Sequence, residues 1–325
     1  MRRTIRVFTA GVVLLLAMTP AGAQTKAPPE TRNAALRYWL AFADLQDPPA
    51  DKTVADLLEK TAAGEAAWNE EKLGGILDAN EAAIERMQRA TKLPDCDWGL
   101  EYELGPRASI AYMPKARVLA RLNTLEGMRL AAKGDTQKAV DAWLAGIHFS
   151  QDVAKGGPLI FALVAKRGML ANFRALNEAA EAGRLSSKQK RQIEAVVQAL
   201  PESGLDWSKA FWYEQDPIDV GVTEMAAAAD PAAYYREIAG NPAPNGFTVP
   251  TTADIVAYHK LMDRVEEALR LSPETAEEPL KKLQESVKTL HPFFRDLTPS
   301  LPRLNQSRLE LEAAREKLLH SLSAR

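Results

Sequence analysis

Apolar residues recur along most of this chain at roughly every third or fourth position, the spacing that places them on one face of an α-helix. Residues that favour helices dominate, and runs of β-branched residues are scarce. The pattern therefore predicts an all-α protein of stacked antiparallel helical hairpins, of the tetratricopeptide-like or α-solenoid kind. The helices that it predicts cover residues 33–45, 51–63, 73–91, 115–133, 135–155, 159–182, 186–200, 205–229, 252–271, 276–290 and 304–322.

One pair of predicted helices carries a repeat-like spacing. Gly127, Gly134, Ala139 and Trp143 follow one another at intervals of seven, five and four residues. In a tetratricopeptide unit, a small residue lets two helices approach and an aromatic ring fills the gap between them. This hairpin therefore carries the clearest repeat signal in the chain, although Leu130 stands where a tetratricopeptide unit has an aromatic residue on its first helix.

The pattern becomes looser after Pro201. Pro217 interrupts a predicted helix, which it should break or kink. We therefore expect a hairpin repeat region over residues 33–200 and a less regular helical region over residues 201–325. The two regions form either separate parts or one continuous domain.

The N-terminus shows the three parts of a secretory signal peptide. Three arginines occur within the first six residues, a short apolar run follows over Val12–Met18, and Ala21–Ala23 supplies small residues for cleavage. The sequence thus predicts a signal peptide over residues 1–23, cleavage near Ala23, a linker over 24–32, and a periplasmic or secreted protein. An uncleaved membrane anchor is the alternative. No later segment is apolar for long enough to cross a bilayer.

The net charge of −2 becomes more negative without the N-terminal arginines, so we expect no nucleic-acid partner. Cys96 is the only cysteine and cannot form an intrachain disulfide. We expect a buried, unreactive thiol there, with a nucleophile as the alternative. The four histidines are not spaced as metal ligands, so we expect no metal and no other cofactor. His148 is expected to be a packing residue.

The helical pattern stops between residues 93 and 114, where prolines and glycines interrupt it. This loop carries four carboxylates within nine residues, together with two aromatic rings and the cysteine (Asp95, Cys96, Asp97, Trp98, Glu101, Tyr102 and Glu103). Paired carboxylates beside aromatic rings can perform acid–base chemistry, and such sites also bind sugars. Alternatively, the rings pack on the helical layer while the acids cap helices or remain in solvent.

A second aromatic and acidic cluster spans residues 207–219. The successive aromatic residues Phe211 to Tyr213 cannot all face one core, so at least one meets another part of the chain, a partner or a ligand. We expect the loop and this cluster to converge on one pocket. The binding residues predicted from both are Asp97, Trp98, Glu101, Tyr102, Glu103, Trp212 and Glu214.

The segment LPDCDWGLEYE over residues 93–103 is followed by Gly105-Pro106 and by a helix that starts near Pro114. Together with the opening NAALRYW over residues 33–39, it resembles a group of exported bacterial proteins of unknown function that have tetratricopeptide-like helical hairpins. The resemblance implies a helical fold and an exported location. It implies no activity and no catalytic residues.

These features favour a binding module for a protein or peptide partner in the cell envelope, because stacked hairpins present a concave face that usually binds peptides or helices. The chain has no Gly-rich phosphate loop, Gly-x-Ser-x-Gly elbow or HExxH motif. The sequence leaves enzymatic activity undecided and favours none. The alternatives are a hydrolase of glycans or peptides that uses the Asp95–Glu103 carboxylates, and a purely structural envelope protein.

Overall fold

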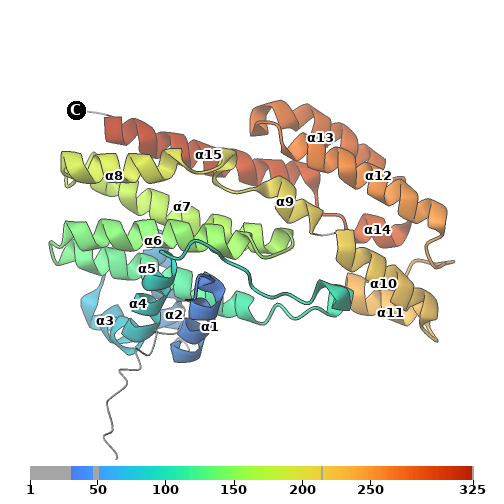
Figure 1. Ribbon diagram of the computed structural model, residues 1–325, viewed down its shortest axis with the longest axis horizontal. Coiled ribbons are helices and arrows are strands. Elements are labelled where there is room, and N and C mark those ends of the chain that lie inside the picture. Colours follow the sequence, from blue (N-terminus) through green and yellow to red (C-terminus); the bar gives the residue numbers. More distant parts are fainter. Residues whose placement is uncertain (1–30, 47–50, 214, 324–325) are drawn as a thin grey trace, which may run out of the picture. The chain divides into compact units, whose positions relative to one another are not determined.

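Short turns join consecutive antiparallel helices through the middle of the chain in the computed structural model of the protein (Figure 1). The structure describes residues 31–46, 51–213 and 215–323. The predicted signal peptide, most of the predicted linker and Glu214 lie outside the described residues. Residues 32–325 form one compact unit.

The described residues are helical and contain no strand, which confirms the all-α prediction. No described helix is long and apolar enough to cross a membrane. The helices are α1 (Ala34–Asp44), α2 (Lys52–Ala62), α3 (Glu70–Ala79), α4 (Glu81–Ala90), α5 (Tyr112–Ala132), α6 (Thr136–Ala154), α7 (Leu159–Glu181), α8 (Ser187–Gln198), α9 (Trp207–Trp212), α10 (Gln215–Ala227), α11 (Pro231–Ala239), α12 (Thr252–Leu269), α13 (Pro273–Val287), α14 (Pro292–Leu297) and α15 (Leu301–Ser323), with 3₁₀ turns η1 (Tyr102–Arg107) and η2 (Glu202–Gly204).

The centre of the fold is the sequential stack of α5, α6 and α7. Gly134 takes a φ of 83° in the turn between α5 and α6, a conformation that glycine adopts without steric cost. At Gly127 the two helices approach so closely that a Cβ atom would lie 2.2 Å from Nε1 of Trp143. The indole of Trp143 fills this contact and donates a hydrogen bond of 3.2 Å to the Thr124 carbonyl.

The predicted helix over residues 73–91 is two helices, α3 and α4, which meet at Asn80. The backbone of Asn80 leaves the helical region, with φ −113° and ψ 9°. Its side chain is 2% exposed, donates to the Ile76 carbonyl and accepts from the Gln46 amide. A buried side chain that satisfies two backbone groups stabilises the break, which helix propensity alone does not predict.

The predicted break near Pro217 occurs a few residues earlier. The helix α9 ends at Trp212, and α10 begins at Gln215, so that Pro217 lies in the first turn of α10. A proline is tolerated there because the first amides of a helix have no intrahelical acceptor. The sequence pattern missed α11 and α14, which are short.

The last helix returns to the first half of the chain. Leu311 and Leu318 of α15 are fully buried, and α15 packs along α7. Its Arg315 guanidinium donates to the Val197 carbonyl at the end of α8. The C-terminal helix therefore completes the core of the hairpin stack.

Candidate functional site

The loop that precedes α5 is anchored to the start of α1. The Ala34 amide donates to the Asp95 carbonyl at 2.7 Å, and the Asn33 side chain exchanges two hydrogen bonds with the backbone of Asp97. The two segments over residues 33–39 and 93–103, which we singled out in the sequence, thus contact each other directly. The first function of this pairing is structural, because it satisfies backbone groups of a segment that has no helix of its own.

Trp98 is a core residue. Its side chain is 4% exposed, and its ring stacks on Tyr112 with centroids 4.3 Å apart and planes 7° apart. Its indole donates a 2.8 Å hydrogen bond to the Asp152 carbonyl near the end of α6. A Cβ at Gly156 would lie 2.0 Å from the same ring. The ring is therefore enclosed by protein and has no face left for a ligand.

The buried Asp152 carboxylate organises this region. It accepts hydrogen bonds of 2.7 Å from the Tyr38 hydroxyl and from the Lys155 ammonium group. The Cys96 thiol lies 3.8 Å from the Asp152 carbonyl, and burial together with the Asp152 charge raises the pKa of the thiol. A thiol held in its protonated form is a poor nucleophile, so the geometry supports the unreactive role predicted for Cys96.

The four carboxylates of the loop all lie on exposed residues. Asp95 forms an ion pair with Arg32 at 3.0 Å, and Asp97 accepts the Gly99 amide at 2.9 Å. A general acid needs an environment that disfavours its charge, usually burial against an apolar wall. The described surroundings of Asp97, Glu101 and Glu103 provide no such wall, because the neighbouring Trp98 points into the core.

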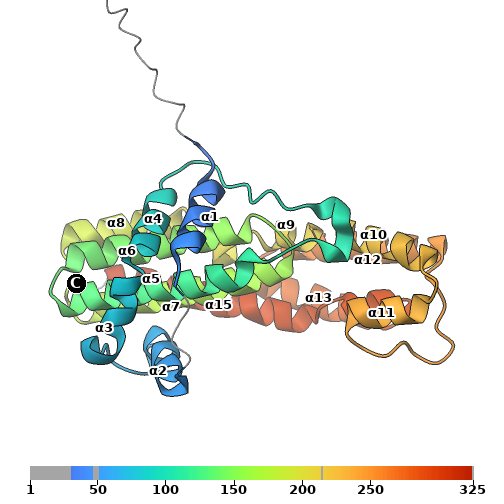
Figure 2. The same cartoon turned by 90° about the horizontal axis from the view of Figure 1, so that it is seen from below.

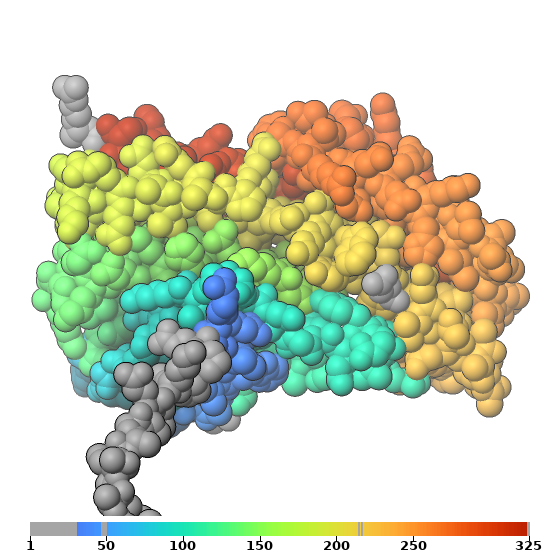
Figure 3. All heavy atoms as spheres, viewed as in Figure 1, coloured from blue at the N-terminus to red at the C-terminus, as the bar shows by residue number. Residues whose placement is uncertain are grey.

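The loop contacts the second aromatic cluster, but through packed rings and not through the pocket that we expected. The rings of Tyr102 and Tyr213 stack with centroids 5.1 Å apart and planes 7° apart, and η1 packs against α10 (Figure 3). A Cβ at Gly105 would lie 2.6 Å from Val220. Trp212 packs edge-on against Tyr213 and is 44% exposed. The meeting is thus a packed contact with one exposed indole beside it.

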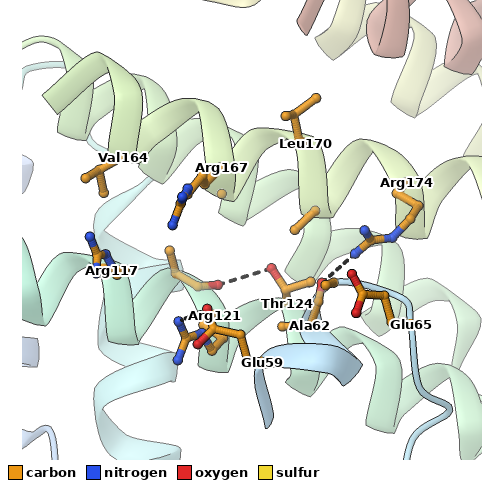
Figure 4. A pocket seen from close by; sticks show the side chains of 14 residues that line it. Glu59, Ala62, Glu65, Arg117, Arg121, Thr124, Val164, Arg167, Leu170 and Arg174 are labelled. Carbon is orange, nitrogen blue, oxygen red and sulfur yellow. Dashed lines mark hydrogen bonds and ion pairs between the residues drawn. The ribbon is translucent and has the colours of Figure 1, made fainter. Parts of the chain in front are cut away.

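A different site, which the sequence did not suggest, lies between α2, α5 and α7. It is an open cleft of about 450 Å³ (Figure 4). Its floor consists of small and aliphatic residues of α5 and α7, among them Ala120, Val164 and Gly168. A Cβ at Gly168 would lie 2.8 Å from Ser150 Oγ and 3.6 Å from Ala120 Cβ, so this glycine allows α7 to approach its neighbours.

Four arginines line the cleft, and two of them are engaged by the protein itself. Arg121 forms a 2.7 Å ion pair with Glu59 of α2. Arg174 donates from Nη2 to the Ala62 carbonyl at 2.5 Å, while its buried Nε makes no hydrogen bond and lies 3.7 Å from the Glu178 carboxylate. Burial lowers the pKa of Arg174. These two guanidinium groups tie α2 to the hairpin stack.

The other two arginines, Arg117 of α5 and Arg167 of α7, are exposed and have no hydrogen-bond or ion-pair partner among the described residues. Figure 4 shows both at the same end of the cleft, with Arg174 at the other end. The lining contains only two acidic residues, Glu59 and Glu65, so its net charge is positive. The cleft can therefore bind a group that carries negative charge.

The arginines of this site are visible in the sequence only as two separate pairs on two helices. Arg117 and Arg121 are four residues apart and Arg167 and Arg174 seven, so each pair shares one helix face. Nothing in the sequence shows that the two faces oppose each other. Their convergence depends on the packing of α5 against α7.

Among the described residues, no group of three or more His, Cys, Asp or Glu side chains is arranged to hold a metal ion. Comparison of the chain with protein-family models, with curated proteins and with solved structures gives no match.

Proposed function

We propose that the protein is a binding module for a protein or peptide partner in the cell envelope, and that the partner docks in the cleft between α2, α5 and α7. The observation that carries this proposal is the cleft itself. It is open, it has a floor of small side chains, and it offers two guanidinium groups without a partner in the described residues. Such a depression between helices accepts an extended peptide or a single helix of a partner.

One feature of the sequence supports the envelope location: the N-terminal segment has the composition of a signal peptide. The Gly127–Trp143 contact supports a tetratricopeptide-like hairpin, whose relatives by architecture are binding proteins rather than enzymes. The exposed carboxylates of the loop give no comparable support to a hydrolase.

Site-specific photo-crosslinking tests the proposal. A photoreactive phenylalanine analogue placed at Ala171, on the cleft wall, should form a discrete adduct with a partner in a cell-envelope extract from the organism that makes the protein. The same analogue at Ala195, an exposed residue of α8 outside the cleft, is the matched control and should form no such adduct. An unlabelled full chain should compete for the partner and reduce the yield of the adduct.

Equal crosslinking from both positions would contradict docking in the cleft. Thermal unfolding of the chain that carries the analogue at Ala171 checks that the fold is intact, and Leu170, which also lines the cleft, provides a second position for the analogue.

A further inference from the structure

The cleft carries information about the chemistry of its ligand. Resting on the proposed function, we infer that it binds an acidic peptide segment of the partner, whose side-chain carboxylates are held by Arg117 and Arg167. The inference follows from the charges of the lining, from the pairing of each arginine and from the dimensions of the cleft.

The first argument is the unequal pairing of the four guanidinium groups. Arg121 and Arg174 already have acceptors on α2, namely the Glu59 carboxylate and the Ala62 carbonyl. Arg117 and Arg167 have none in the described chain, although they project into the same cleft from two different helices (Figure 4). Two guanidinium groups at one end of a cleft create a positive local potential that favours the binding of an anion there.

The second argument is the match between guanidinium and carboxylate. A guanidinium group is planar, keeps its charge at any physiological pH and offers paired N–H donors that fit the two oxygens of a carboxylate. The floor of Ala120, Val164 and Gly168 offers little polar surface to compete for these donors. An acidic side chain bound there would exchange water for two charge-assisted hydrogen bonds.

The third argument concerns length. Arg167 and Arg174 are seven residues apart on α7, which corresponds to about 10 Å at the helical rise of about 1.5 Å per residue. An extended peptide advances about 3.3 Å per residue, so about three residues fit along this wall. The geometry favours acidic residues of the peptide at the Arg117 end and small residues over the floor near Gly168.

Glu59 acts in this arrangement as an internal competitor. Its carboxylate lies 2.7 Å from Arg121, on a helix that lies at the edge of the helical stack (Figure 2). The Glu59 side chain is 63% exposed, so the pair contributes little to stability. Replacing Glu59 by glutamine should free Arg121 for the ligand and tighten binding by roughly two- to fivefold.

Fluorescence anisotropy with a labelled, amidated octapeptide of glutamate and alanine tests the inference, and a glutamine–alanine octapeptide is the matched probe. The wild-type chain should bind the glutamate peptide at least about tenfold more tightly, because its carboxylates can accept charge-assisted hydrogen bonds from Arg117 and Arg167 and carry the opposite charge, whereas the glutamine amides are neutral. R117Q/R167Q should abolish this preference. R191Q, at an exposed arginine of α8 outside the cleft, should keep it. R117Q/R167Q is expected to unfold at the same temperature as the wild-type chain, because both residues are exposed and neither has a partner among the residues that the structure describes.

The outcomes separate this inference from the proposed function. Equal affinity for the two peptides, no detectable binding of either, or unchanged binding by R117Q/R167Q would overturn acidic recognition. A cleft-specific crosslink at Ala171 would still leave the proposed function in place in each of these cases. Inorganic phosphate is the probe for a free small anion. If millimolar phosphate displaces the peptide completely, and a ligand with a single carboxylate is sufficient to bind in the cleft, then the cleft recognises small anions and the peptide assignment is wrong.

Discussion

The loop over residues 93–111 and the arginine cleft use their side chains for opposite purposes. The loop holds the most distinctive residues of the chain, and its indole, its thiol and a tyrosine hydroxyl all contact the end of α6 or the turn after it. The cleft is lined largely by ordinary arginines and alanines, yet two of its guanidinium groups have no partner in the part of the chain that the structure describes. Unusual residues in an irregular segment can therefore mark a packing requirement, while common residues on three helices form the candidate site.

The physical reason is the termination of α6. The last four carbonyls of a helix have no intrahelical donor. The Asp152 carbonyl is one of these, and it accepts the Trp98 indole at 2.8 Å. Tyr102 donates to the Gly156 carbonyl in the following turn. The loop thus caps α6 from a distance in sequence, which explains why its aromatic residues combine an apolar ring with a polar atom.

The largest expected effect that tests this comparison is on stability. Trp98→Ala should lower the free energy of unfolding by about 3–5 kcal/mol, because it removes a stacked core ring and leaves the Asp152 carbonyl without its donor. Urea denaturation measures this loss. The control Trp212→Ala removes a ring that is 44% exposed and should cost about 1 kcal/mol or less. If the Trp98→Ala chain had unchanged stability but no longer bound its partner, the loop and not the cleft would be the binding site.

A smaller effect is expected where α5 serves both the core and the cleft. Gly127→Ala should lower the free energy of unfolding by about 1–3 kcal/mol, since its Cβ would overlap Trp143 and force the helices apart. Gly75→Ala is the matched control, because a Cβ there meets no atom within 4 Å. It should stabilise α3 by up to about 1 kcal/mol through helix propensity. Similar destabilisation by both substitutions in urea denaturation would contradict a tight contact at Gly127.

The smallest effect concerns pH. Burial lowers the pKa of His148 on α6, so the folded chain favours the neutral imidazole. The unfolded chain then binds more protons between the lowered pKa and the ordinary value near 6.5, and stability falls as the pH drops through this interval. We expect a loss of less than about 1 kcal/mol between pH 7.5 and 5.5 from this residue.

Urea denaturation of His148→Gln at several pH values measures this dependence, which should become weaker. Ala195→Gln, at an exposed residue of α8, introduces the same amide without removing a titratable group, so it is the control and should leave the slope unchanged. A steeper slope for His148→Gln would mean that the imidazole is charged in the folded protein. The cleft should be insensitive over the same range, because its guanidinium groups stay charged.

Most of the helices could be predicted from the sequence because their signals act within one or two turns. Ser186 was expected to begin a helix, and it caps α8 reciprocally with Gln189. The division at Asn80 was not predictable in this way, since the stabilising hydrogen bond comes from Gln46, 34 residues earlier. The pairing of the loop with α1 spans more than 60 residues and likewise has no local signal.

By itself, the sequence determined the helical class, the approximate helix boundaries and the presence of an interrupted segment before α5. These depend on periodicity and capping, which act between residues close in the chain. Only the tertiary structure decided that Trp98 fills the core and that Arg117 and Arg167 face one cleft. Whether these arginines face each other depends on how α2, α5 and α7 pack. The sequence around an arginine on a helix face is the same whether its side chain points to bulk solvent or toward a second arginine across a cleft.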